Sequence, residues 1–173
     1  TGDITYTNVM KLDSGRVYVF YRRGSSSDGD QYFIYSDDNG DTWSSEQQLT
    51  SWFSNTNPYQ QFTTNGEEIH VSFSTSNGSK SVGSGGNDGR YDLYHVFYNG
   101  SCWKKFGSGC KSLPLSPSDT ELVYDTPDNQ YSWNWDTSLE NGKPRMVFAD
   151  KILSENHIYK QARWDGSSWS VET

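Results

Sequence analysis

The feature that most constrains how this chain can fold is a pattern that occurs three times along it. Each unit opens with an aromatic strand and passes through a glycine-containing turn into a short apolar strand. The turns contain Gly15, Gly66 and Gly142, and the apolar strands are expected at Val17–Tyr21, Ile69–Phe73 and Arg145–Ala149. Because self-similarity of this kind is the signature of repeat architectures, we expect three similar structural units.

The second half of each unit is equally regular. A third strand precedes a second turn, and a tryptophan follows the glycine of that turn by three residues. These pairs are Gly40 and Trp43, Gly100 and Trp103, and Gly166 and Trp169. Each unit therefore predicts two hairpins, or four antiparallel strands, closed by a strand that carries the tryptophan.

These units predict an all-β chain made of β-propeller blades. A four-stranded sheet of this composition has an apolar face that must be covered, and radial stacking of blades covers it. No segment shows sustained helical periodicity. We place the blades at about residues 1–53, 54–126 and 127–173. Since propellers usually close with more blades, we expect a fragment of a larger propeller or half of a homo-oligomeric ring.

Composition narrows the possible partners. Aromatic residues make up 16% of the chain, half of its 32% hydrophobic content, so rings supply much of the core. The formal net charge of −8 disfavours nucleic acid, although a local basic site for an acidic polysaccharide is still possible. No apolar run is long enough to cross a membrane.

The two cysteines and the first residue bear on the compartment. Cys102 and Cys110 lie eight residues apart around a glycine-containing loop. A disulfide that staples a hairpin is favoured over two free thiols, which indicates an extracellular or periplasmic protein. Because the chain begins at Thr1 and shows no signal peptide, we interpret it as a processed product or an excised piece.

One turn carries a recognisable motif. The segment SDDNGDTW, residues 36–43, fits the Asp-box pattern S-x-D-x-G-x-T-W. Ser36 and Asp38 can satisfy backbone amides in the turn, Gly40 can take a positive φ, and Trp43 can pack between sheets. We therefore interpret Asp38 as structural and not as a catalytic acid.

A wider resemblance covers nearly the whole chain. The succession GRVYVFYR, SDDNGDTW, EIHVSFS, DLYHVFY, WNWD, KPRMVFA and YKQARWDG resembles the Asp-box repeat family that includes the ulvan lyases and related polysaccharide lyases. The resemblance implies a seven-bladed propeller, of which this chain would supply three blades. It also implies cleavage of uronate-containing polysaccharide by β-elimination, without a cofactor.

The same resemblance suggests three catalytic residues. His95, in DLYHVFY, matches a site histidine and would act as the base or neutralise the uronate carboxylate. Arg163, in QARWDG, matches an arginine that would bind this carboxylate in a fork. Tyr159 precedes Arg163 by four residues and shares its face of the strand. The alternatives are an internally hydrogen-bonded histidine, a strand-end ion pair and blade packing, respectively.

Two positions depart from the family pattern. Asn77 lies where a T-D-G-H-P histidine is expected, and we count it among the candidate substrate-binding residues. Phe148 replaces a tyrosine and has no hydroxyl to move a proton. His70 could substitute for the missing histidine if it faces the channel, but a packed or solvated role is favoured.

Three further residues are candidates for substrate binding. Trp133 and Trp135 alternate in YSWNWD and face one side of a strand with Tyr131, either as a sugar-stacking platform or as core between blades. Either Arg22 or its neighbour could point into the axial groove and bind an acidic sugar.

These observations favour a polysaccharide lyase, with a lectin-like glycan-binding propeller as the alternative. A sialidase ranks last because no sialidase arginine motif is evident. The histidine spacing predicts no metal site, and no phosphate-binding loop is present. The expected partner is an acidic polysaccharide or oligosaccharide.

Overall fold

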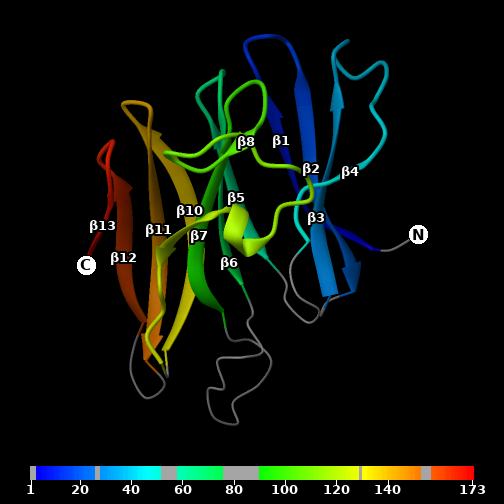
Figure 1. The fold of residues 1–173 in the computed structure, drawn as a ribbon. Helices are drawn as coiled ribbons and strands as arrows, with labels where there is room; N and C mark the ends of the chain where they lie inside the picture. The colour runs from blue at the N-terminus through cyan, green and yellow to red at the C-terminus, as the bar shows by residue number, and fades with distance from the viewer. Residues whose placement is uncertain (1–2, 26–27, 52–57, 76–89, 129, 153–156) are drawn as a thin grey trace.

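The computed structural model describes residues 3–25, 28–51, 58–75, 90–128, 130–152 and 157–173, which form three antiparallel sheets (Figure 1). The first sheet contains β1 (Ile4–Lys11), β2 (Val17–Ser25), β3 (Asp28–Ser36) and β4 (Gln47–Gln48). The second contains β5 (Tyr59–Thr64), β6 (Ile69–Thr75), β7 (Tyr91–Tyr98) and β8 (Trp103–Lys104). The third contains β10 (Gln130–Glu140), β11 (Lys143–Ile152), β12 (His157–Trp164) and β13 (Trp169–Glu172).

Each sheet follows the order of its strands in the sequence, so every connection within a blade is a hairpin. The second blade has one additional strand, β9 (Glu121–Tyr124), which follows a single 3-10 turn at Pro117–Asp119 and pairs with β7 beyond the end of β8. We did not predict β9 as a separate strand.

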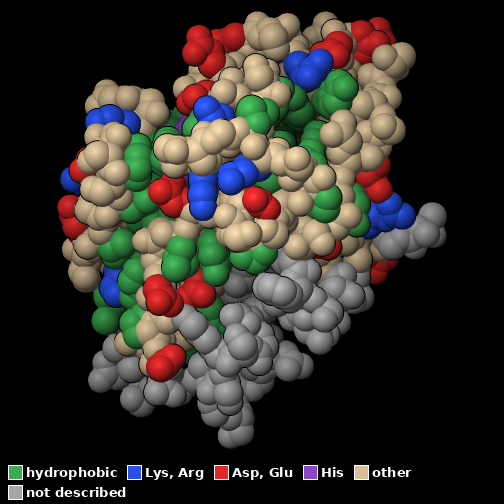
Figure 2. All heavy atoms as spheres, in the orientation of Figure 1, with side chains coloured by type: hydrophobic (Ala, Val, Ile, Leu, Met, Phe, Trp, Pro, Cys, Tyr) green, Lys and Arg blue, Asp and Glu red, His purple; other side chains and the backbone are tan. Residues whose placement is uncertain are grey.

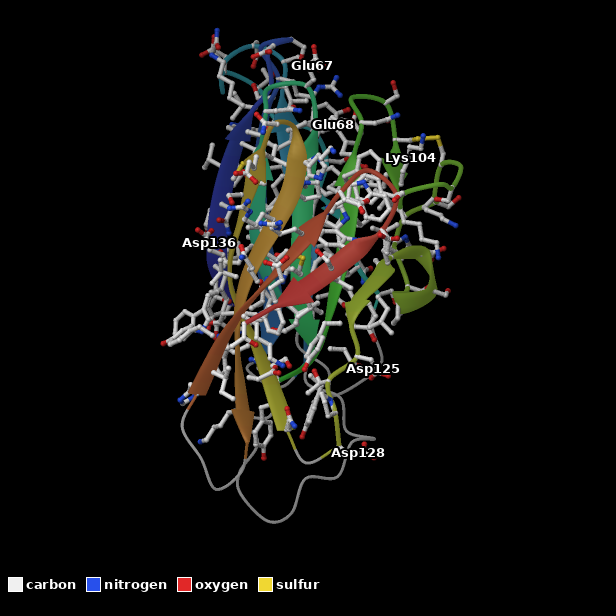
Figure 3. All side chains as sticks on the ribbon, turned by 90° about the vertical axis from the view of Figure 1, so that its left-hand side faces the viewer. Glu67, Glu68, Lys104, Asp125, Asp128 and Asp136 are labelled. Atoms are coloured by element: carbon white, nitrogen blue, oxygen red, sulfur yellow. A yellow bond between two sulfur atoms is a disulfide. The ribbon has the colours of Figure 1, made fainter. Side chains whose placement is uncertain are left out.

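The blades stand side by side with the second blade in the middle (Figure 1). The first strands of neighbouring blades, β1, β5 and β10, contact one another. In Figure 3, β1 lies on the side where Asp136 of β10 is labelled, and β8 lies on the opposite side, where Lys104 is labelled. This arrangement places the first strand of every blade nearest a common axis, as in a propeller.

Strand alternation explains how the blades pack. In β2, Tyr18 and Phe20 point toward the second blade and are buried, and in β6, Val71 and Phe73 point back toward them. A smaller core between the second and third blades contains Leu93, Val123, Met146, Phe148 and Ala162. Phe148 is completely buried there, so its side chain is part of the core between blades.

The Asp box forms a closed local network. The Ser36 hydroxyl donates to Asp38 Oδ1 over 2.7 Å and accepts from the amide of Gly40, whose φ is 100°. The amide and hydroxyl of Thr42 donate to Asp38, and these bonds hold the pKa of the Asp38 carboxyl at about 2. In these contacts Asp38 has the turn-forming role that we expected.

Two expectations for this unit were wrong. Trp43 is 42% exposed and its ring lies near Gly40, so in this chain it does not pack between sheets. The closing strand of the first blade, β4, begins four residues after Trp43, whereas β8 and β13 begin at their tryptophans.

A disulfide joins Cys102 to Cys110, the pair expected from the sequence. The disulfide closes a short loop, and directly after this loop the Lys111 amide donates to the Trp103 carbonyl over 2.8 Å. No helix among the described residues is long and apolar enough to cross a membrane.

Candidate functional site

The three residues expected to be catalytic do not come together. His95 lies on β7 with no exposed surface, packed against Phe106 and Trp169. Tyr159 and Arg163 lie on β12 on the face opposite Ala162, which points into the core near His95. A polymer that contacts Tyr159 and Arg163 therefore cannot also contact His95 in this conformation.

Tyr159 and Arg163 are accessible but differ in their surroundings. Tyr159 is 64% exposed. Arg163 forms an ion pair with Glu172 on β13, with 3.6 Å between Nη2 and Oε1. This pair matches the alternative interpretation of Arg163 as a strand-end ion pair.

His95 belongs to a buried histidine pair. Its Nε2 lies 3.1 Å from Nδ1 of His70, and Nε2 of His70 lies 3.2 Å from a carboxylate oxygen of Glu68. Burial lowers the pKa of both imidazoles, and for His95 the proximity of His70 adds to the effect. His70 therefore does not face a channel, and both rings pack between the second and third blades.

A continuous row of aromatic rings crosses the first strands of all three blades. We call this set, which contains Tyr6, Tyr59, Trp133 and Trp135, the aromatic row. The ring centroids of successive members are 4.8, 5.4 and 6.4 Å apart. Trp135 is 53% exposed and Tyr6 is 44% exposed, so the two ends of the row are open to a ligand. Tyr131 lies on the same face of β10, as expected.

Two arginines lie over this row. The guanidinium of Arg22 lies 4.6 Å from the centroid of the Tyr6 ring, and that of Arg90 lies 4.8 Å from Tyr59 and 5.5 Å from Trp133. Each distance is within the range of a cation–π contact. Charge and aromatic surface therefore alternate across the blades.

Arg22 is the more unusual of the two, because it is only 8% exposed and lacks a carboxylate partner in the described part of the chain. Its Nε donates to the Thr5 hydroxyl over 3.2 Å. The next residue, Arg23, faces the other way and pairs with Glu46. A buried cation that lacks a counter-charge is well suited to an anionic ligand.

The backbone shapes the row at both ends. The pairing register shifts at Thr5/Asn8 in β1 and at Asn134/Asp136 in β10, so Tyr6 and Trp135 both sit at bulges. Tyr6 has a φ of 54°, which is rare for an aromatic residue. Bulges redirect single side chains, and the two rings at these bulges, Tyr6 and Trp135, are exposed.

A hydrogen-bonded network fixes the segment that carries Arg90. The Arg90 carbonyl accepts from the Ser132 amide over 2.7 Å. Asp92, with a φ of 50°, exchanges two bonds with Thr126: its amide donates to the Thr126 hydroxyl, and its carboxylate accepts from the Thr126 amide. The segment that carries Arg90 is therefore bonded to β10 through Ser132 and to the residues after β9 through Thr126.

Electrostatics distinguish Tyr59 within the row. Burial, a hydrogen bond to Tyr6 and the proximity of the Tyr6 hydroxyl raise the pKa of Tyr59 to about 12, although Arg90 and Arg22 act in the opposite direction. Tyr59 is therefore protonated at neutral pH and can donate a hydrogen bond to a ligand.

The sequence identified Arg22, Trp133 and Trp135 as substrate-binding candidates but missed Tyr6, Tyr59 and Arg90. The signal for two of these was present, since Tyr6, Tyr59 and Trp133 all belong to the aromatic opening of their units. Asn77 lies outside the described residues. Among the described residues, no group of three or more metal-ligating side chains occurs.

Comparisons with known proteins place this geometry in context. A family model for BNR repeat-containing proteins matches residues 1–173. No curated protein matches. Among solved structures, an ulvan lyase described as a new family of polysaccharide lyase aligns with a TM-score of 0.78 at 21% identity, over 97% of this chain and 43% of its own.

Two further structures align over almost the whole chain. The polysaccharide lyase Uly1 has a TM-score of 0.73 at 15% identity and covers 98% of this chain and 40% of its own. An α-L-arabinanase from Cellvibrio cellulosa, complexed with arabinohexaose, has a TM-score of 0.60 at 11% identity and covers 96% and 56%, respectively. The fold is thus a β-propeller, and the chain spans less than three-fifths of the length of each of these structures.

Proposed function

Because this chain belongs to the BNR repeat-containing family, we propose that its aromatic row is the substrate-binding part of a polysaccharide-lyase-like propeller that acts on a uronate-bearing polysaccharide. The single observation that carries the proposal is Arg22, a buried guanidinium without a carboxylate partner among the described residues, next to exposed aromatic rings. The lyases named among the similar structures support the choice of substrate class.

The chemistry of β-elimination assigns a role to each group. Arg22 binds the uronate carboxylate, which makes the C5 proton more acidic. The Tyr6 hydroxyl oxygen, next to Arg22, takes this proton while it passes its own proton to Tyr59, as the C4–O bond breaks and a C4=C5 bond forms. The electron pair goes to the leaving oxygen, which takes the Tyr59 proton. The hydrogen bond between Tyr6 and Tyr59 carries the proton from one hydroxyl to the other, so both side chains again hold their protons when the products leave.

The stacking surface supports binding of a polymer. Trp133 and Trp135 extend the row from Tyr59 onto the third blade. Aromatic faces pack against the C–H faces of sugar rings, so this part of the row would hold the residues next to the cleaved bond.

The direct test is ultraviolet absorbance during incubation with a panel of uronate polysaccharides, including ulvan. β-Elimination leaves a conjugated unsaturated uronate that absorbs, whereas hydrolysis and binding do not produce this chromophore. We expect absorbance to rise with the wild-type protein, and to be lost with Tyr6→Phe and Arg22→Gln. A flat trace from folded protein that still binds the polysaccharide would contradict cleavage by this chain.

Glycan binding without cleavage is the second candidate. It is favoured by the position of His95, the expected base, which is sealed between two blades. This function predicts equal polysaccharide binding by the wild-type protein and Tyr6→Phe, with no product from either.

A further inference from the structure

The space between neighbouring blades is filled differently at the two interfaces. Between the second and third blades, Phe106 stacks on Trp164 with 4.1 Å between centroids and an angle of 4°, and it also stacks on His95 at 5.2 Å. Phe97 lies 5.0 Å from the same ring. The flat ring of Phe106 therefore fills a slot between these two blades, with His95 and Phe97 on one side and Trp164 on the other.

The strand pairing identifies the corresponding slot between the first and second blades. At the first interface, Tyr18 lies opposite Tyr35 and Tyr98 lies opposite Trp103 in the strand register. The corresponding pairs at the second interface are His70 with Phe97 and Trp164 with Trp169. At the first interface these positions surround an open cavity of about 310 Å³. Its walls include Tyr18, Tyr35, Tyr98 and Trp103, and among the described residues that line it no ring takes the place of Phe106.

Polar groups surround this cavity. Arg16 lies over the Tyr35 ring at 4.2 Å and is held by two bonds to Asp37, of 2.6 and 2.9 Å. Gln47 and Lys111 also line the space. Lys111 forms no ion pair with any described residue, so its ammonium is available to an anion, whereas the charge of Arg16 is already compensated.

We propose that this cavity is a second saccharide site, which takes one pyranose ring with an anionic substituent. The sugar ring occupies the slot that Phe106 fills at the other interface and packs its C–H face against the tyrosines. Its hydroxyls bond to Gln47, and its anionic group lies near Lys111. The volume is within the range of small-molecule sites.

The site is separate from the aromatic row. Arg16 directly precedes β2 and Arg22 lies six residues further along the chain, about 20 Å away along an extended strand. Both walls come from blades within this chain, so the cavity does not depend on further blades. Figure 2 shows hydrophobic side chains in a recess near the upper ends of β2 and β8, with basic side chains beside it.

Nuclear magnetic resonance titration with sodium glucuronate, and with glucose as the neutral control, tests the proposal. We expect glucuronate to shift the Trp103 indole and the Gln47 side-chain amide, and glucose to shift them less. Lys111→Gln should weaken glucuronate binding about threefold, the effect typical of an accessible charge pair. Gln47→Phe, which supplies the missing ring, should abolish the Trp103 shift.

Two controls separate this site from the proposed function. Lys151→Gln removes an exposed charge on β11 of the third blade and should leave the titration unchanged. Arg22→Gln should also leave the Trp103 shift intact, even if it abolishes binding or cleavage at the aromatic row. If glucuronate does not shift the Trp103 indole, or if Lys111→Gln and Gln47→Phe both titrate like the wild type, the second site does not exist.

Discussion

The charge of Arg22 is the residue-scale feature on which the binding site depends. Its guanidinium is buried beside Tyr6, and its only polar partner among the described residues is the Thr5 hydroxyl. A carboxylate ligand would supply the missing counter-charge. Since charged hydrogen bonds contribute about 1.5–3 kcal/mol, Arg22 alone could change affinity roughly 10- to 100-fold.

Gly29 tests whether the position of this guanidinium matters. A Cβ at Gly29 would lie 3.0 Å from Cδ and Cγ of Arg22, closer than packed carbons normally approach. We therefore expect Gly29→Ala to displace the Arg22 side chain and weaken binding of uronate oligosaccharides severalfold, with the fold retained. Calorimetric titration beside circular dichroism measures both effects. Unchanged affinity in a folded variant would mean that Arg22 tolerates the shift.

At the scale of elements, the contact between the second and third blades depends on two features. One is a pair of buried histidines that is uncharged, and the other is a stack of flat aromatic rings. The His70–His95 pair and the Phe106–Trp164 stack lie next to each other in this interface. The stability that the histidine pair contributes depends on pH, whereas the stability from the stack depends on the Phe106 ring. Each contribution can therefore be tested separately.

The histidine pair predicts that stability falls in mild acid. Burial lowers the pKa of both imidazoles below the ordinary value of 6.5. Below pH 6.5 the unfolded chain therefore binds protons that the folded protein does not, and each histidine would cost at most about 1.4 kcal/mol per pH unit. This loss ends below the folded-state pKa. Glu68, next to His70, partly opposes the lowering of the His70 pKa. Glu121 on β9 lies opposite His95 of β7 in the strand register.

Denaturant unfolding between pH 7.5 and 5 measures this dependence. His95→Phe should flatten the profile in this range, whereas His157→Asn, at an exposed position on β12, should not change it. A wild-type profile that is flat across this range would contradict the neutral buried pair.

Phe106 predicts a localised loss of stability. We expect Phe106→Ala to lower the free energy of unfolding by about 2 kcal/mol, less than a fully buried phenylalanine because this side chain is partly exposed. The matched Phe106→Leu variant should lose less, since it keeps the apolar contact. A Phe106→Leu variant as stable as the wild type would argue against ring stacking as the source of the stability.

The sequence predicted the elements better than the site. Glycine turns and alternation identified the apolar strands that became β2, β6 and β11, because these signals are local. The site depends on which rings from different blades meet, and only strand register and bulges determine this. Trp133 and Trp135 were recognisable as an alternating pair, but the φ of Tyr6 and the contact of Tyr59 with two other blades were not.

The position of His95 shows the same limit. The stretch DLYHVFY indicates a strand, but the face of that strand that carries His95 is covered by β13 and by Phe106. A sequence motif can thus contain the histidine expected from the family while the surrounding side chains bury it. Sequence reasoning alone had no signal for Phe106.

On the scale of the whole molecule, the outer faces of the first and third blades carry exposed apolar side chains. These are Ile4 and Val9 on β1, and Val147 and Tyr159 on the third blade. In a propeller, such faces pack against further blades. We therefore expect this chain to self-associate when it is isolated.

Sedimentation velocity over a range of concentrations measures this association. Val147→Lys should shift the distribution toward the monomer, and Ser118→Lys, at an exposed polar position in the 3-10 turn of the second blade, serves as the control. A monodisperse wild-type monomer at high concentration would contradict the expectation.

The central claim is that Arg22 recognises the carboxylate of a uronate, and the most direct measurement compares two ligands on two proteins. The ligands are a uronate oligosaccharide and the same oligosaccharide with its carboxyl groups reduced to alcohols, each titrated calorimetrically into the wild type and Arg22→Gln. We predict that the wild type prefers the acidic ligand by roughly tenfold or more and that Arg22→Gln loses this preference. If Arg22→Gln discriminates between the two ligands as strongly as the wild type does, Arg22 is not the carboxylate site.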